Sequence, residues 1–146
     1  MISESGLILV VEDDRDFAEI LAVNLSNAGY DVAVASDGLS ALRAFETESP
    51  ALITLDLSLP IVSGFRLIHL FKRQRPDVPV IVVTALDFEE AEDAAWAGAD
   101  DFVTKPLDPL LLVEKANHFL TTKSLPLAVA GQAAAGALST PVGAPR

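Results

Sequence analysis

Polar residues that could do chemistry stand at the ends of short apolar runs at four places in the chain. They are the acidic triplet Glu12-Asp13-Asp14, the carboxyl of Asp56, the hydroxyl of Thr84 and the amine of Lys105. Several carboxylates gathered without cationic partners repel one another at neutral pH, so they need a counter-charge. Mg²⁺ fits this need, because it prefers oxygen ligands and keeps positions open for water and phosphate oxygens. We expect Asp13, Asp56 and a carbonyl group to be sufficient ligands.

The same residues predict phosphoryl transfer onto a carboxylate. Asp56 would act as the nucleophile and become an aspartyl phosphate, while Mg²⁺ and Lys105 stabilise charge on the phosphoryl oxygens. The hydroxyl of Thr84 is expected to donate a hydrogen bond to that phosphate. Each residue alone has an ordinary explanation, since strand-end acids often cap helices and a single lysine is usually solvated. Only the combination is specific.

These residues need secondary-structure elements that bring them together. Five short apolar, β-branched runs are typical of strands buried on both faces, and segments with helical spacing lie between them. This alternation predicts a doubly wound α/β fold, with a parallel sheet and helices on both faces. Ligands of such sheets bind beyond the carboxyl ends of the strands, so the polar positions should converge there. The predicted strands are residues 7–11, 32–35, 51–55, 80–84 and 102–104.

Composition narrows the class of protein. The 146 residues are 51% hydrophobic, which suits one core, so we predict one domain over residues 1–122. Residues 123–146 are rich in Ala, Pro and Gly and are predicted to be a flexible tail or linker. The formal charge of −11 argues against direct binding to nucleic acid. Since there are no cysteines and neither a signal segment nor a membrane span is recognised, we expect a cytoplasmic location without membrane contact.

Four motifs together resemble the receiver domains of two-component response regulators. The chain reads VVEDD at 10–14, DLSLP at 56–60, VTA at 83–85 and KP at 105–106. The resemblance extends from residue 7 to about residue 121 and implies a flavodoxin-like sheet of order 2-1-3-4-5. It also implies that Asp56 receives its phosphoryl group from a sensor histidine kinase or a histidine phosphotransfer protein. The domain would then be a signalling switch rather than an enzyme, limited to self-phosphorylation and autodephosphorylation.

The resemblance assigns roles around the metal. Asp13, Asp56 and the backbone carbonyl of Ser58 would bind Mg²⁺, and Glu12 would hold a metal-bound water. The family frequently has Asp where this chain has Glu12, so metal affinity is expected to differ modestly. A cis bond between Lys105 and Pro106 is implied as well, at the low cost that an X-Pro bond allows.

Switching is implied to run from Thr84 to Phe102, whose ring would turn inward on phosphorylation. Because phenylalanine has no hydroxyl, we expect the inward state to be favoured already. The spacing of the last helix places Leu110 and Leu111 toward solvent. Trp96 could join them in an apolar patch that contacts a downstream protein or a second copy, or it could fold over the sheet edge instead. The small Ala18 and Ala22 of the first helix suggest a docking site for a phosphohistidine-bearing helix, or plain solvent surface.

Alternative functions remain at this point. The chain could be a stand-alone receiver, or a receiver module of a larger regulator whose effector lies outside it. An aspartyl-phosphate phosphatase is disfavoured, because such enzymes resemble D-x-D-x-T whereas Leu57-Ser58-Leu59 follows Asp56. A flavin-binding protein is disfavoured because the acidic first loop would repel the phosphate of FMN.

Overall fold

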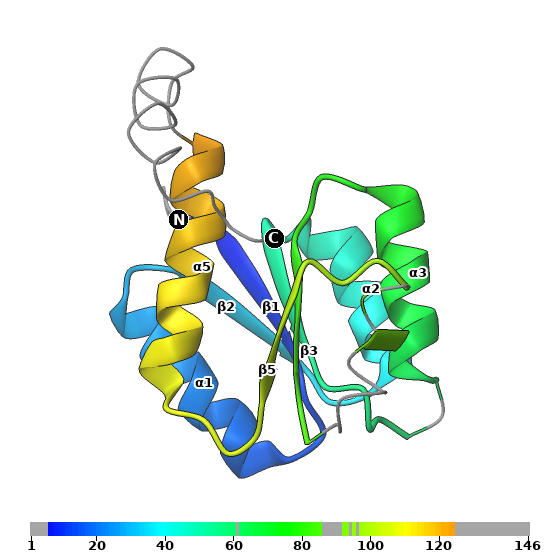
Figure 1. Ribbon diagram of the computed structural model, residues 1–146, viewed down its shortest axis with the longest axis horizontal. Coiled ribbons are helices and arrows are strands. Elements are labelled where there is room, and N and C mark those ends of the chain that lie inside the picture. The colour runs from blue at the N-terminus through cyan, green and yellow to red at the C-terminus, as the bar shows by residue number, and fades with distance from the viewer. Residues whose placement is uncertain (1–5, 61, 86–91, 94, 96, 125–146) are drawn as a thin grey trace.

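The computed structural model describes residues 6–60, 62–85, 92–93, 95 and 97–124. They form a parallel five-stranded sheet of order β2-β1-β3-β4-β5, which confirms the predicted doubly wound fold (Figure 1). The strands are β1 (Leu7–Val11), β2 (Asp31–Ala35), β3 (Leu52–Leu55), β4 (Val80–Thr84) and β5 (Asp101–Thr104). The helices are α1 (Arg15–Asn27), α2 (Gly38–Glu48), α3 (Gly64–Gln74) and α5 (Pro109–Ser124). The predicted strands agree with these bounds to within one residue.

Two hydrophobic cores lie on opposite faces of the sheet. Alternate side chains of a strand point to opposite faces, so β1 contributes Leu9 to one core and Ile8 to the other. Helices α2 and α3 cover the first core with Phe45, Leu67 and Phe71. Helices α1 and α5 cover the second core (Figure 1), where Leu21, Leu25, Leu112 and Ala116 are buried. The central strands are thereby held rigidly, as a site at their ends requires.

The prediction that all five strands are buried on both faces is wrong for the two edge strands. The side chains of β1, β3 and β4 are almost completely buried, whereas Val34 in β2 is 51% exposed and Phe102 in β5 is 40% exposed. An edge strand has a neighbouring strand on one side only. Its outer residues therefore remain partly in contact with solvent.

Helix α5 begins at Pro109 and runs past the predicted domain boundary at residue 122. The Asp108 carboxylate accepts a hydrogen bond from the Leu110 amide at 3.0 Å, so this residue caps the helix ahead of Pro109. The helix ends at Ser124, and residues 125–146 lie outside the described part of the chain. Among the described residues, helices long and apolar enough to cross a bilayer are not found.

Candidate functional site

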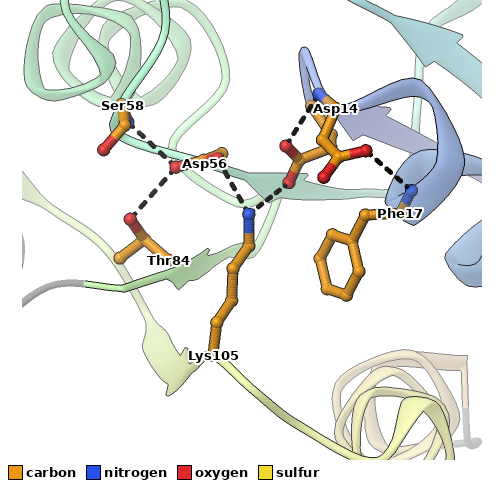
Figure 2. Close-up of polar contacts among 7 residues, drawn as sticks. Asp14, Phe17, Asp56, Ser58, Thr84 and Lys105 are labelled. Atoms are coloured by element: carbon orange, nitrogen blue, oxygen red, sulfur yellow. Dashed lines mark hydrogen bonds and ion pairs between the residues drawn. The ribbon is translucent and has the colours of Figure 1, made fainter.

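The carboxyl ends of four strands meet at one edge of the sheet. Strand β1 pairs with β3, β3 with β4 and β4 with β5, all in parallel. The pairing continues beyond the strands, because the Asp56 amide donates to the Val11 carbonyl at 3.0 Å and the Lys105 amide donates to the Thr84 carbonyl at 2.9 Å. This register brings the polar residues that follow the strands into direct contact (Figure 2).

Asp56 lies at the centre of the site and is only 5% exposed. Its Oδ1 accepts hydrogen bonds from the Thr84 hydroxyl at 3.0 Å and from the Ser58 amide at 2.9 Å, and its Oδ2 accepts from Lys105 Nζ at 3.1 Å (Figure 2). Burial by itself would raise the pKa of Asp56. The hydrogen bonds from Ser58, Lys105 and Thr84 and the charge of Lys105 outweigh burial, so the pKa lies below its ordinary value. The carboxylate is therefore ionised at neutral pH, as a nucleophile must be.

Glu12 is a second buried carboxyl with the opposite tendency. It is 2% exposed, and burial raises its pKa to about 7. Hydrogen bonds from the Asp14 amide at 3.1 Å and from Lys105 Nζ at 3.0 Å to its carboxylate oxygens oppose this rise only in part. The negative charge of Asp56 nearby also raises the Glu12 pKa. Asp56 and Glu12 share Lys105 as their cationic partner. Near neutral pH, Asp56 is therefore charged, whereas Glu12 is partly protonated.

Lys105 supplies the counter-charge that the sequence suggested a metal would provide. Its ammonium bridges Glu12 and Asp56, so these acids do have a cationic partner among the described residues. Burial would lower the Lys105 pKa, but the two ion pairs raise it, and the side chain stays charged. The peptide bond from Lys105 to Pro106 is cis.

Three acidic side chains are close enough to share one cation. Oxygen atoms of Glu12, Asp13 and Asp56 lie within 4.8 Å of one another, and Asp13 is exposed to solvent. An all-oxygen cluster with one open side fits a hard divalent ion such as Mg²⁺, which keeps part of its water shell. Asp14 was expected to converge with these acids, but it does not belong to the cluster. It is the N-cap of α1, and its carboxylate accepts a hydrogen bond from the Phe17 amide at 3.2 Å.

One contact at the site was not predicted from sequence. The Lys105 ammonium lies 4.5 Å from the centre of the Phe17 ring. Phe17 was not among the residues to which the sequence assigned a chemical role. The available signal was its position in the first turn after the acidic loop, although its contact with a distant lysine could not be read from periodicity.

Of the predicted switch and output residues, Thr84 lies in this pocket, whereas Phe102, Leu110 and Leu111 are exposed on the surface. Val103 fills the core beneath α1 and α5, so Phe102 points to the opposite face of the sheet at its edge. The expectation that its ring already favours the inward state is therefore wrong for this structure. Leu110 and Leu111 are exposed as predicted, at 58% and 40%. Trp96 lies outside the described residues.

The two small residues of the predicted docking site on α1 differ in exposure. Ala18 is 3% exposed and packs against the core, yet it lines the same hollow as Ala22. The half-buried Ala22 lines a hollow of about 650 Å³ beside the acidic loop. Glu12, Asp13, Arg15, Glu19 and Val34 contribute to the same hollow.

The family model described as the response regulator receiver domain matches residues 8–117. The chain belongs to this family. Receiver domains are signalling domains of two-component systems and bind Mg²⁺ at an acidic pocket, the place that Glu12, Asp13 and Asp56 occupy in this receiver. The resemblance suggested by the motifs is thus confirmed.

Two curated relatives show the context in which such receivers occur. The alkaline phosphatase synthesis transcriptional regulatory protein PhoP of Bacillus subtilis (strain 168) is 42% identical over 104 residues, which are 70% of this chain and 43% of the relative. The DNA-binding dual master transcriptional regulator RpaA of Synechocystis sp. is 38% identical over 104 residues, or 69% of this chain and 43% of the relative. The receiver thus spans less than half the length of either protein. The prediction of no direct binding to nucleic acid is not borne out by these relatives, which are named transcriptional regulators.

Solved structures agree with this assignment. The BeF3-activated DrrB receiver domain has a TM-score of 0.75 at 33% identity, covering 83% of this chain and 99% of that one. The longer response regulator DrrB, a Thermotoga maritima OmpR/PhoB homologue, has the same TM-score at 32% identity, covering 84% of this chain and 54% of that one. The fold and its receiver character are therefore supported by both sequence and structure.

Proposed function

We propose that this receiver accepts a phosphoryl group from a phosphohistidine onto Asp56 and transmits the change to a protein partner. The observation that supports the proposal best is the state of Asp56. It is buried, its pKa is lowered, and it is held by Thr84, Ser58 and Lys105 beside two further acids. This arrangement combines a nucleophile with cationic and hydrogen-bond donors for a phosphate.

The chemistry follows from these contacts. An Asp56 carboxylate oxygen forms the new bond to phosphorus while the phosphorus–nitrogen bond of the donor breaks, and its electron pair stays on the imidazole nitrogen. Lys105, now paired with Asp56 and Glu12, can turn its ammonium toward the phosphoryl oxygens. Bound Mg²⁺, held by Asp13, Asp56, the Ser58 carbonyl and, through water, Glu12, would neutralise charge on those oxygens.

Thr84 is the proposed start of the switch. Its hydroxyl now donates to Asp56 Oδ1, and after phosphorylation it would donate to the phosphate instead. Thr84 pairs with Thr104 and Val82 pairs with Phe102, so a displacement at the end of β4 would also displace β5. We propose that the exposed Phe102, Leu110 and Leu111 then form part of the surface that contacts the partner or a second copy, with Trp96 as a further candidate.

The effector is the second part of the proposal. Because the relatives are more than twice as long as the matched segment and are named transcriptional regulators, a receiver module that controls a DNA-binding effector is one candidate. A stand-alone receiver acting by protein contacts alone is the other. In either case we propose that the receiver extends to the end of α5 at Ser124, past the predicted boundary, and that residues 125–146 are a tail or linker. A cytoplasmic location and a sensor histidine kinase or phosphotransfer protein as donor accompany both candidates.

Phosphorylation by a small donor tests the proposal directly. The protein is incubated with phosphoramidate, whose phosphorus–nitrogen bond mimics phosphohistidine, with and without Mg²⁺, and its intact mass is measured. We expect one added phosphoryl group that requires Mg²⁺ and is lost in Asp56→Asn. Asp14→Asn is the matched control, because Asp14 is a neighbouring acid that caps α1 and asparagine caps equally well. Phosphorylation of Asp56→Asn, or none in the wild type, would contradict the proposal.

A further inference from the structure

The Lys105 ammonium is held from three directions. Glu12 Oε1 lies 3.0 Å away, Asp56 Oδ2 lies 3.1 Å away, and the ring centre of Phe17 lies 4.5 Å away (Figure 2). The two carboxylates belong to the acidic cluster that can share a cation, whereas the ring does not. The lysine therefore has one contact that is independent of the metal ligands.

The position of the Phe17 ring is set by the fold. Phe17 is in the first turn of α1, and its amide donates to the capping carboxylate of Asp14 at 3.2 Å. Its ring is half-buried and packs against the core formed by α1, α5 and the sheet. The position of the aromatic ring is thus fixed by its helix, whereas the four-carbon side chain of Lys105 is flexible and needs contacts that hold its ammonium in place.

A divalent cation at the acidic cluster changes the balance among these contacts. It would share the charge of Glu12 and Asp56, so their attraction for the lysine would weaken. The ring attracts an ammonium through its negative π face and offers no oxygen to a hard cation, so its attraction persists. A partly buried contact of this kind shifts an equilibrium by about three- to tenfold.

We propose that Phe17 is a positioning residue for Lys105. It keeps the ammonium beside Asp56 when the acids are occupied by a cation, so that the charge is in place for the incoming phosphoryl group. The inference rests on the proposed role of Asp56 as acceptor and adds a residue that contacts neither metal nor phosphate.

Three variants separate positioning from packing. Phe17→Leu removes the aromatic ring and keeps most of the side-chain volume, whereas Phe17→Tyr keeps the ring. Phe119→Leu is the matched control. Phe119 is also half-buried against the same core, so the same substitution is made there without removing the ring beside Lys105. All variants are compared at equal folded fraction, established by thermal unfolding.

The first measurement does not depend on phosphorylation. In NMR spectra of the protein with saturating Mg²⁺, the ε-methylene protons of Lys105 should show the upfield shift caused by a nearby ring. We expect Phe17→Leu to abolish this shift, and Phe17→Tyr and Phe119→Leu to keep it. A wild-type Lys105 signal at the position of a free lysine would overturn the inference.

The second measurement is the rate of phosphorylation by phosphoramidate at saturating Mg²⁺, together with the Mg²⁺ dissociation constant from calorimetry. We expect Phe17→Leu to lower the rate of phosphorylation about three- to tenfold with Mg²⁺ affinity unchanged. Phe17→Tyr should keep a rate close to that of the wild type. In a Lys105→Met background, Phe17→Leu should have no further effect, because the residue acts through the lysine. An equal loss in both backgrounds, or a rate unaffected by Phe17→Leu, would overturn the inference. If wild type takes up no phosphoryl group at all, the proposed function fails first, and the two failures remain distinct.

Discussion

Glu12 and Asp56 are neighbouring carboxyl groups whose pKa values are pushed in opposite directions. Both carboxyl groups are buried and paired with Lys105, but the further hydrogen bonds from Ser58 and Thr84 to Asp56 help to outweigh burial there, whereas burial prevails at Glu12. The consequence is that Asp56 stays charged while Glu12 can take up a proton near neutral pH. The total charge of the pocket therefore depends on the protonation of Glu12 near neutral pH.

The raised pKa of Glu12 predicts a pH dependence of stability in the metal-free protein. The folded state holds this proton up to about pH 7, whereas the unfolded chain releases it near the ordinary value of 4.5. Between these values the folded state binds more protons, so the free energy of unfolding decreases as pH rises from about 5 to 7 and then levels off. We expect a loss of roughly 1 to 3 kcal/mol over this window.

Urea unfolding at several pH values measures this effect. Glu12→Gln should flatten the curve between pH 5 and 7, because it cannot ionise. Saturating Mg²⁺ should flatten it too, since a bound cation favours the charged carboxylate. If the free energy of unfolding of the wild type rises with pH in this window, Glu12 is not the group that dominates the pH dependence of stability.

At the scale of single elements, the loop from β3 to α3 depends on a close backbone approach. A Cβ placed on Gly64 would lie 2.5 Å from the Leu57 Cα and 3.1 Å from its carbonyl oxygen. Leu57 is the residue between Asp56 and Ser58, so the helix start and the site loop are in direct contact. This close approach explains physically why glycine stands at position 64.

Gly64→Ala is therefore expected to disturb both stability and the site. The added methyl group must push the loop backbone away, at a cost of about 1 to 3 kcal/mol in the free energy of unfolding. Mg²⁺ affinity should fall as well, because Asp56 and the Ser58 carbonyl would shift. Denaturant unfolding and calorimetric Mg²⁺ titration measure the two effects. Unchanged Mg²⁺ binding in a destabilised variant would show that the loop can relax without moving the site.

The start of α1 is a second element-scale test. Asp14→Ala removes the carboxylate that accepts the Phe17 amide and should destabilise the protein by about 1 kcal/mol, whereas Asp14→Asn should be close to neutral. Thermal unfolding distinguishes the two. Equal losses would mean that the charge of Asp14 matters more than its capping hydrogen bond.

At the scale of the whole molecule, phosphorylation at one edge of the sheet has to change a surface elsewhere. The exposed leucines of α5 lie on a different part of the surface from Leu39 of α2, which is similarly exposed at 54%. Leu39 is therefore a suitable control for the loss of an exposed apolar side chain.

We expect Leu110→Ala combined with Leu111→Ala to weaken phosphorylation-dependent self-association or partner binding several-fold, because apolar area at an interface contributes to affinity. The rate of phosphorylation should be unchanged, since neither residue touches the site. Sedimentation velocity with and without phosphoramidate and Mg²⁺ measures association. The same loss in Leu39→Ala would argue for a general effect of surface hydrophobicity, and no loss in either would assign the leucines to another role.

The sequence by itself determined the fold class and the meeting of Glu12, Asp13, Asp56, Thr84 and Lys105. The reason is topological, because alternating strands and helices form a parallel sheet, and all carboxyl ends of its strands then lie at one edge. Residues at strand ends converge in such a sheet whatever the details of packing.

Only the tertiary structure decided how the converging residues share their contacts. Asp14 caps a helix while Asp13 faces the cluster, Lys105 bridges two acids over the Phe17 ring, and Phe102 points outward. These outcomes depend on burial and on distances of a few ångströms between segments far apart in the chain. Local periodicity carries no information on such distances, because packing between elements sets them.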